Sequence, residues 1–309
     1  MTERNKNSAG KNSSAKRHSR LRWLGLGGAL VLVLGASGYA VRWHYQFYHH
    51  ITPQELSHEV RRSAFQATIR GGPALQLQLY QQENAAHQPL VLFTSGDGGW
   101  SPFCADMAAH IAAGGNTVVG IDAKDYLVKF ATPKNPVSAD DLTRDYDELA
   151  RQSLAQPGVD AKAPIILAGW SLGAGYSVIV ASAPDFNYPV KRVVAISLPM
   201  LGELAWKSTD ALIYITHKTP HEQVFDAHQY LKKLDHTPIV FLNATDDDTA
   251  PLNEAKSLFA VAPGVKRFFA VKASGHHFEG GEEEFYRDLD LGVSPSQMVD
   301  NNNKKMKEI

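Results

Sequence analysis

The strongest chemical signature in the sequence is a serine flanked by glycines, in the segment GWSLG at residues 169–173. The apolar run APIILA precedes it, and an apolar segment with helical spacing follows it. A strand-turn-helix context is the one in which a G-x-S-x-G serine projects its hydroxyl as a nucleophile. The pattern therefore predicts that Ser171 is a nucleophile and that the backbone N–H of Leu172 meets an oxyanion. Because such patterns also arise by chance in glycine-rich sequences, the prediction depends on partner residues elsewhere.

A serine hydroxyl at neutral pH needs a histidine base and an acid that orients the base. Both types of residue follow strand-like runs downstream of Ser171. The segment DDDTAP at 246–251 comes after PIVFLNAT, and SGHHF at 274–278 comes after KRFFAVKA. The order serine, acid, histidine, with each residue on a loop after a strand, is the order of the α/β-hydrolase fold.

Three adjacent aspartates compete for the role of the acid. We favour Asp247, because its spacing to Pro251 matches the turn that opens the following helix in this fold. Asp246 and Asp248 are then expected to have structural roles, one as a turn stabiliser and one as a helix N-cap.

Two adjacent histidines compete for the role of the base. We favour His276, which directly follows Gly275, and His277 remains the alternative. The aspartates and histidines together also suggest a metal site, but the triad interpretation already uses these positions. The sequence therefore predicts no metal and no cofactor.

A second oxyanion donor is expected from the loop after the third strand, which here is SGDGGW at 95–100. Asp97 occupies the usual donor position, and we expect Trp100 and Trp170 to contact substrate along with it. A carboxylate beside an oxyanion is unexpected, since it repels the developing negative charge. Asp97 is therefore predicted either to cap the turn or to face a cationic group on the substrate. The loop is no phosphate cradle, because no G-K-[ST] follows it.

The elements that must position these residues alternate between strand and helix patterns. A period-two run at 75–80 predicts an antiparallel edge strand, and continuous apolar runs predict buried parallel strands. The runs lie at 89–94, 116–123, 163–170, 191–199, 238–245 and 266–273, with helical patterns at 138–155, 172–183, 251–260 and 282–290. The alternation predicts a mostly parallel, doubly wound sheet of the α/β-hydrolase class over residues 75–293. The insertion at 200–237 is too short for a large lid.

The N-terminal region differs in character from the rest of the chain. Residues 1–22 carry seven Lys and Arg side chains and one acid, whereas residues 23–41 carry no charge. A helix of that length spans roughly 30 Å of hydrocarbon. The positive-inside rule then predicts a basic cytoplasmic leader, a single transmembrane anchor at 23–41 and a body outside the cytoplasm. A cleaved signal peptide ending near Ala40 is the alternative.

The remaining segments and the composition narrow the class of protein. Residues 42–74 are predicted to be a linker leading into the domain, and residues 294–309 a polar, disordered tail. The chain is 44% hydrophobic and 20% charged, with a net charge of −1. No basic stripe with interleaved aromatics appears in the body, so we predict no binding of nucleic acid. Cys104 is the only cysteine, which excludes an internal disulfide.

The combination of SGDGGW, GWSLGAG and GHHF resembles the VirJ/AcvB family of bacterial virulence-associated α/β-hydrolases. The resemblance covers roughly residues 75–290, and SGDGGW is an unusual replacement for the common His-Gly oxyanion motif. It implies Ser171, Asp247 and His276 as the triad, with Asp97 and Leu172 at the oxyanion site. The sequence departs from the family pattern at 125–128, DYLV, where a more aromatic stretch is expected.

The resemblance also implies a location and a substrate. Such proteins are periplasmic, and the family includes enzymes that hydrolyse the lysyl or alanyl ester of aminoacyl-phosphatidylglycerol. We therefore expect a serine esterase, held at the inner membrane by residues 23–41, that acts on a membrane lipid. The alternatives are a phospholipase or general carboxylesterase, a thioesterase or peptidase, and a non-enzymatic accessory protein of a type IV secretion system.

Overall fold

The computed structural model describes residues 60–82, 88–132, 134–205 and 224–294. The chain divides into two units, Met1–Ile51 and Thr52–Ile309, and all described residues belong to the second. The predicted leader, the anchor at 23–41 and nearly all of the predicted C-terminal tail lie outside the described residues. Within the described ranges, no helix is both long and apolar enough to cross a membrane.

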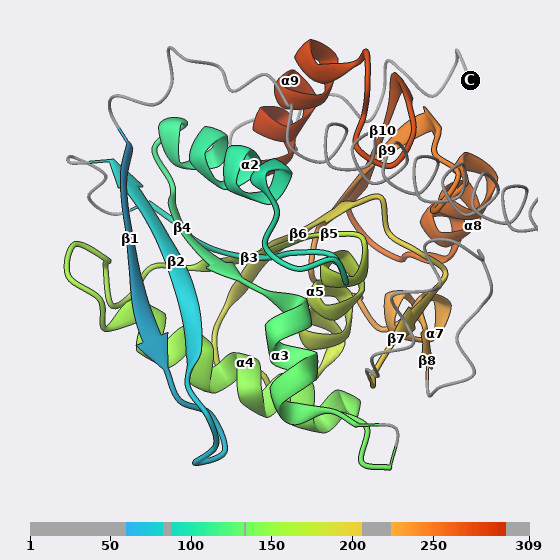
Figure 1. Cartoon of the computed structure of the whole chain (residues 1–309). Helices are drawn as coiled ribbons and strands as arrows, with labels where there is room; N and C mark the ends of the chain where they lie inside the picture. The colour runs from blue at the N-terminus through green and yellow to red at the C-terminus, as the bar shows by residue number, and fades with distance from the viewer. Residues whose placement is uncertain (1–59, 83–87, 133, 206–223, 295–309) are drawn as a thin grey trace, which may run out of the picture. The chain divides into compact units, whose positions relative to one another are not determined.

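A single eight-stranded sheet organises the described part of the chain, in the order β1-β2-β4-β3-β5-β6-β9-β10 (Figure 1). The strands are β1 (Val60–Ala67), β2 (Leu75–Gln82), β3 (Leu90–Thr94), β4 (Thr117–Ile121), β5 (Ile165–Trp170), β6 (Val190–Ile196), β9 (Ile239–Asp246) and β10 (Lys266–Ser274). The strands β4, β3, β5, β6, β9 and β10 are parallel to one another, whereas β2 pairs antiparallel with both of its neighbours, β4 and β1. The central strands β3, β4 and β5 are buried along their whole length, as expected for parallel strands covered on both faces.

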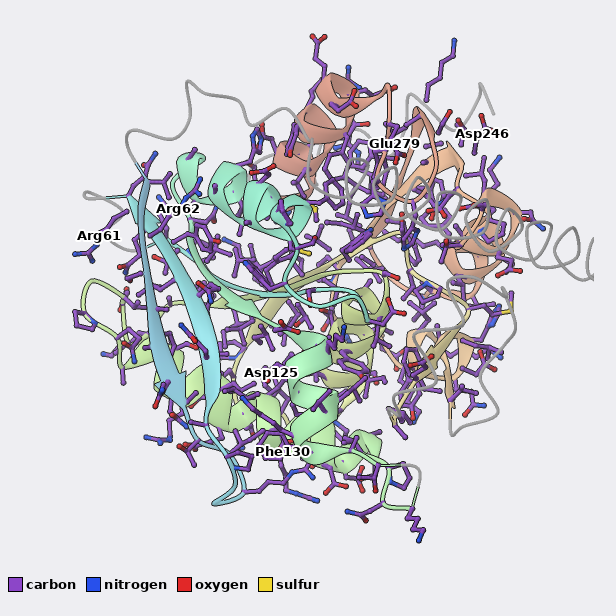
Figure 2. All side chains as sticks on the ribbon, in the orientation of Figure 1. Arg61, Arg62, Asp125, Phe130, Asp246 and Glu279 are labelled. Atoms are coloured by element: carbon purple, nitrogen blue, oxygen red, sulfur yellow. The ribbon has the colours of Figure 1, made fainter. Side chains whose placement is uncertain are left out.

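The sequence pattern at 75–80 correctly indicates an antiparallel strand, but β1 pairs outside it and occupies the edge of the sheet. Only the two ends of β1, Val60 and Ala67, are buried, so its sequence carries little hydrophobic alternation. Arg61 and Arg62 lie on this outer strand (Figure 2). Exposed charged side chains on an edge strand discourage pairing with a second sheet.

Helices cover both faces of the sheet (Figure 1). On one face, α2 (Pro102–Ala113) and α9 (Glu282–Val293) pack in one hydrophobic core. The other face carries α3 (Ala123–Phe130), α4 (Ala139–Leu154), α5 (Leu172–Ser182), α7 (Ala227–Leu231) and α8 (Leu252–Val261) in a second core. The result is a doubly wound α/β-hydrolase fold. The 200–237 insertion contributes the short antiparallel pair β7 (Leu201–Glu203) and β8 (Val224–Asp226) and α7, while 206–223 lie outside the described residues.

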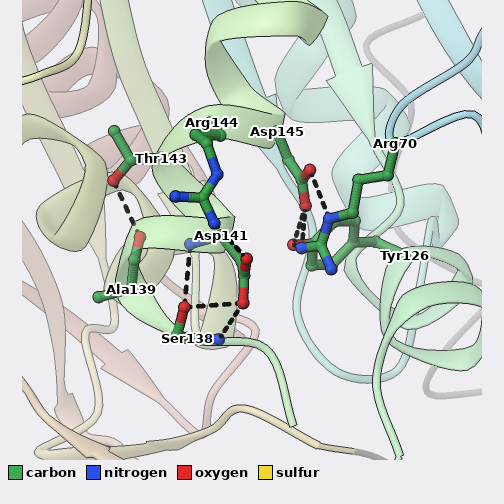
Figure 3. Close-up of polar contacts among 8 residues, drawn as sticks. All are labelled: Arg70, Tyr126, Ser138, Ala139, Asp141, Thr143, Arg144 and Asp145. Atoms are coloured by element: carbon green, nitrogen blue, oxygen red, sulfur yellow. Dashed lines mark hydrogen bonds and ion pairs between the residues drawn. The ribbon is translucent and has the colours of Figure 1, made fainter. Parts of the chain in front are cut away.

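A half-buried ion pair and a capping box fix α4 against the sheet (Figure 3). The Asp145 carboxylate accepts hydrogen bonds from Arg70 Nε at 2.8 Å and from the Tyr126 hydroxyl at 2.6 Å. These bonds tie α4 to α3 and to the turn between β1 and β2. At the start of α4, Ser138 and Asp141 form a reciprocal capping box, which satisfies amides that have no carbonyl partner inside the helix.

Candidate active site

Ser171 occupies the sharp turn between β5 and α5. Its backbone has φ 55° and ψ −122°, a left-handed conformation that L-residues rarely adopt. The Ser171 N–H donates to the Ile196 carbonyl at 2.9 Å, and the residue is 6% exposed. Backbone strain of this kind persists only where the surrounding structure imposes it, and it is concentrated at functional sites.

The two glycines of the motif are required because neighbouring backbone fills the space of any side chain. A Cβ at Gly169 would lie 2.2 Å from the carbonyl atoms of Gly173. A Cβ at Gly173 would lie 2.2 Å from the Thr94 carbonyl oxygen and 2.5 Å from that of Ser95. The glycines therefore allow β3, β5 and α5 to approach closely enough to form the turn.

The structure brings His276 and Asp247 together, although they lie on different loops. His276 Nδ1 is 3.0 Å from Asp247 Oδ1 and 2.9 Å from Oδ2. The Asp247 side chain is fully buried and the His276 side chain is 12% exposed. Asp247 Oδ1 also accepts the backbone N–H groups of Thr249 and Ala250, at 2.9 and 2.8 Å. These bonds fix the carboxylate in one orientation toward the imidazole.

The electrostatics of this pair determine which nitrogen of His276 carries the proton. Burial alone would raise the pKa of Asp247, but the hydrogen bond and charge of His276 and the Ala250 N–H lower it below its ordinary value. Asp247 is therefore an ionised acceptor at neutral pH, so Nδ1 of His276 must be the donor. Nε2 then carries the lone pair of a base. It is buried and has no hydrogen-bond partner among the described residues.

The roles expected for the neighbouring aspartates need correction. Helix α8 begins at Leu252 with Pro251 as N-cap and no side-chain cap, so neither Asp246 nor Asp248 caps it. The turn is stabilised by Asp247 itself, through the Thr249 and Ala250 amides. No second aspartate is needed for the turn, because the buried Asp247 carboxylate can direct one oxygen toward these amides and still accept a hydrogen bond from His276.

A short reverse turn after β10 presents His276. Ser274 and Glu279 exchange two backbone hydrogen bonds of 2.9 Å, and the Gly275 N–H donates to the Asp246 carbonyl at 2.9 Å. Gly275 has φ +66°, and a Cβ there would lie 2.6 Å from Glu279 Oε2. Figure 2 shows Asp246, which ends β9, and Glu279, which lies in the turn after β10. Glycine before His276 is thus a requirement of the turn.

The two adjacent histidines differ in their aromatic contacts. The Trp170 ring is centred 5.1 Å from the His276 ring, and its Nε1 donates to the His276 carbonyl at 3.1 Å. His277 packs against Phe103 as well as Trp170, with 5.3 and 4.9 Å between the ring centres. Trp170, 4% exposed, therefore supports the histidine turn, and its role as a substrate contact stays a prediction.

The loop at 95–100 lies beside Ser171, which its residue Gly96 adjoins. A Cβ on Gly96 would lie 3.4 Å from Ser171 Cβ and 3.2 Å from the Trp170 ring. No sequence signal beyond the glycine-rich turn identifies Gly96. Leu172 is the first residue of α5, where helix amides have no intrahelical carbonyl. The loop and this helix end therefore both adjoin Ser171, and an oxyanion site formed by their backbone N–H groups stays a prediction.

The side chains of the loop point in different directions. Asp97 is partly exposed, and its Oδ1 accepts the Gly98 N–H at 3.1 Å. The Trp100 ring packs over Gly120, where a Cβ would lie 2.1 Å from it, and contacts Phe93 with 5.8 Å between ring centres. The contacts of Trp100 are therefore with the sheet, and substrate contact by either residue stays a prediction.

Neither the cysteine nor a metal cluster competes with this arrangement in the described part of the chain. Burial raises the pKa of the Cys104 thiol to about 11, so the residue remains protonated and unreactive at neutral pH. Within the same ranges, no three His, Cys, Asp or Glu side chains are grouped as a metal site requires.

Comparison with known proteins assigns the family and the fold. Residues 88–289 match the family described as "Bacterial virulence protein (VirJ)". No curated protein matches the sequence. Many solved structures share the fold.

Three of these structures illustrate how distant the likeness is. The esterase domain of a Rhodothermus marinus protein is 17% identical, with a TM-score of 0.51 over 75% of this chain and 96% of its own. A dienelactone hydrolase from Anabaena variabilis is 16% identical, with a TM-score of 0.54 over 76% and 97%. A cold-adapted esterase from an Arctic intertidal metagenomic library is 15% identical, with a TM-score of 0.51 over 76% and 95%.

Proposed function

The chain belongs to the VirJ family of bacterial virulence proteins, and we propose that it is a periplasmic serine esterase that hydrolyses the aminoacyl ester of aminoacyl-phosphatidylglycerol. The observation that carries the proposal is the strained Ser171 at a strand-to-helix turn, combined with the buried His276–Asp247 pair. These are the parts that acyl transfer by a serine requires. Ester chemistry is also supported by the names of the similar structures, two of which are called esterases.

In the first half of the reaction, Ser171 Oγ attacks the aminoacyl carbonyl carbon and gives its proton to His276 Nε2. The carbonyl oxygen becomes an oxyanion, which the Leu172 N–H and an amide of the loop at 95–100 stabilise. The tetrahedral intermediate then collapses. The glycerol oxygen of phosphatidylglycerol leaves with the proton from His276, and the aminoacyl group remains on Ser171.

In the second half, His276 takes a proton from water, and the resulting hydroxide attacks the aminoacyl-serine ester. Collapse of the second intermediate breaks the bond to Ser171 Oγ, which recovers the proton from His276. The products are the free amino acid and phosphatidylglycerol. Throughout the cycle, Asp247 stays ionised and stabilises the imidazolium, as its lowered pKa favours.

The choice of substrate rests on three supports. Asp97, a partly exposed carboxylate directly after the serine-facing Gly96, suits a substrate that carries an ammonium group. The predicted anchor at 23–41 would hold the domain against the outer leaflet of the inner membrane, within reach of a lipid substrate. The resemblance of SGDGGW, GWSLGAG and GHHF to the VirJ/AcvB family implies the same lipid.

Lipid product analysis tests the proposal. Purified protein and Ser171→Ala are each incubated with vesicles of phosphatidylglycerol that contain lysyl-phosphatidylglycerol, and released lysine and fatty acids are quantified. We expect lysine and intact phosphatidylglycerol from the wild type only. Release of fatty acids with the lysyl ester intact would make the protein a phospholipase. Absence of both products, with neutral esters also untouched, would favour the non-enzymatic accessory role.

A further inference from the structure

The start of helix α3 holds the loop at 95–100 at both of its ends. At the first end, the Ser95 N–H donates to the Ile121 carbonyl at 3.0 Å, and Ser95 Oγ accepts the Ala123 N–H at 3.0 Å. At the other end, the Trp100 N–H donates to Asp122 Oδ2 at 3.1 Å. Residues 121–123 therefore bind both ends of the loop.

The Asp122 carboxylate serves two structures at once. Its Oδ1 accepts the Asp125 N–H at 2.9 Å and thereby caps α3, while its Oδ2 accepts from the loop. Gly99, with φ +90°, lies directly against it, since a Cβ there would be 3.1 and 3.2 Å from the two carboxylate oxygens. One carboxylate thus joins the helix cap to the backbone of the loop.

The Trp100 side chain fixes the same end of the loop from the other direction. Its indole occupies the space over Gly120, and it also packs against Tyr80, with 6.3 Å between ring centres. Any other residue at position 120 would collide with this ring, because the added Cβ would lie 2.1 Å from it. With Trp100 held by its ring and by its N–H, the four residues before it have little freedom to move.

The restraint matters because the opposite side of the loop faces the nucleophile. Gly96 lies against Ser171 Cβ, and the Gly99 N–H closes the turn onto the Gly96 carbonyl at 3.0 Å. A shift of Gly99 away from Asp122 would therefore move Gly96 relative to Ser171. Stabilisation of an oxyanion requires donors that are already in place when the charge develops.

We propose that Asp122 is a positioning residue that holds the 95–100 loop, and with it the second oxyanion donor, in register with Ser171. The inference rests on the proposed serine mechanism and adds to it a residue outside the predicted triad and oxyanion site. The competing role for Asp122 is that of a helix cap alone.

Asp122→Ser separates the two roles. Serine is as good an N-cap as aspartate, so it can accept the Asp125 N–H. Its side chain is shorter and has one oxygen instead of two, so it cannot accept the Trp100 N–H as well. A matched control is Ser138→Ala, which removes the cap of α4 far along the chain from the loop. The readouts are kcat and KM on a short neutral ester, the rate at which a fluorophosphonate labels Ser171, and Tm.

For Asp122→Ser we expect kcat to fall about 10- to 100-fold with little change in KM, because the lost interaction acts on the transition state. Fluorophosphonate labelling should slow by a similar factor, since its transition state also places negative charge on an oxygen. Ser138→Ala should lower Tm and leave both rates at the wild-type level. Asp122→Asn, which keeps one carbonyl oxygen, should lie between Asp122→Ser and the wild type.

Wild-type kcat and labelling rates in Asp122→Ser would overturn the positioning role and leave Asp122 as a cap. Equal proportional losses in Asp122→Ser and Ser138→Ala would overturn it too, because they would follow from stability alone. Ser171→Ala is measured in parallel. Full activity in that variant would refute the serine mechanism itself, an outcome distinct from a failure confined to Asp122.

Discussion

The imidazole Nδ1 of His276 lies 3.0 and 2.9 Å from the two oxygens of the Asp247 carboxylate, whose side chain is completely buried. A buried carboxylate that is hydrogen-bonded to an imidazole orients the ring and stabilises its protonated form during acyl transfer. The relationship selects one aspartate from the three adjacent ones, because Asp246 and Asp248 are both exposed.

The first prediction concerns this selection. Asp247→Asn should lower kcat by about 10³- to 10⁴-fold, because the amide no longer enforces the tautomer in which His276 Nε2 is the base. Asp246→Asn and Asp248→Asn should have little effect. Steady-state hydrolysis of one ester by the three purified variants provides the measurement. A larger loss in either neighbour than in Asp247→Asn would reassign the acid.

The second prediction concerns stability rather than catalysis. Burial raises the pKa of Asp106 on α2 to about 6, and Arg62 only partly opposes that effect. A carboxyl group whose pKa is raised on folding holds its proton longer in the folded state, so stability falls as pH rises from about 4 to 6. Asp106→Asn should therefore stabilise the protein by about 1–3 kcal/mol at pH 8 and by little at pH 4.

Urea unfolding of wild type and Asp106→Asn at the two pH values measures this difference. Two groups on other elements interact electrostatically with the Asp106 carboxylate, namely Arg62 on β1 and Tyr286 on α9. If the variant is destabilised equally at pH 4 and pH 8, the charge of Asp106 is not the source of the effect.

The sequence patterns predicted the main part of the fold because the parallel strands are buried on both faces. Runs such as IILAGW in β5 are apolar throughout, so a strand can be predicted there without knowing which side chains face which side of the sheet. Strand β1 was missed, since VRRSAFQA places only its two ends in the core. Helix α2 was missed because most of its residues are buried, which removes the polar face from which a surface helix is recognised.

The candidate site was predictable to the extent that its residues follow strands in a fixed order. Ser171, Asp247 and His276 each stand on such a loop, and local motifs identify them. Asp122 had no such signal, because its contact with Trp100 depends on β3 and β4 being neighbours in the sheet. Likewise, no sequence pattern indicates that Asp247 rather than Asp248 accepts the Thr249 and Ala250 amides.

The third prediction tests the substrate through Asp97. If its carboxylate faces the ammonium of an aminoacyl lipid, Asp97→Asn should lower kcat/KM on lysyl-phosphatidylglycerol by roughly 30- to 1000-fold and that on a neutral ester by little. Asp97 Oδ1 also accepts the Gly98 N–H, so a role as turn cap alone predicts equal losses on both substrates and a lower Tm. Rates on both substrates, with Tm, decide between the two.

The fourth prediction concerns the anchor at 23–41, which lies outside the described residues. An alkaline phosphatase fused after residue 60 should be active in a bacterial host, because alkaline phosphatase folds only outside the cytoplasm. The full chain should sediment with membranes. Mass spectrometry of the mature protein provides the control. A soluble periplasmic product that begins near Val41 would show that the segment is a cleaved signal peptide.

The most direct test of the account is the fate of the aminoacyl ester in Ser171→Ala. The variant keeps the turn, the His276–Asp247 pair and the predicted oxyanion donors, and it lacks only the atom proposed to attack. Release of lysine from lysyl-phosphatidylglycerol by wild type and variant is measured under identical conditions, with folding checked by Tm. We predict that the variant retains at most the rate that binding and the oxyanion donors provide, roughly 10³- to 10⁴-fold over water. Lysine release at the wild-type rate would contradict the assignment of Ser171 as the nucleophile.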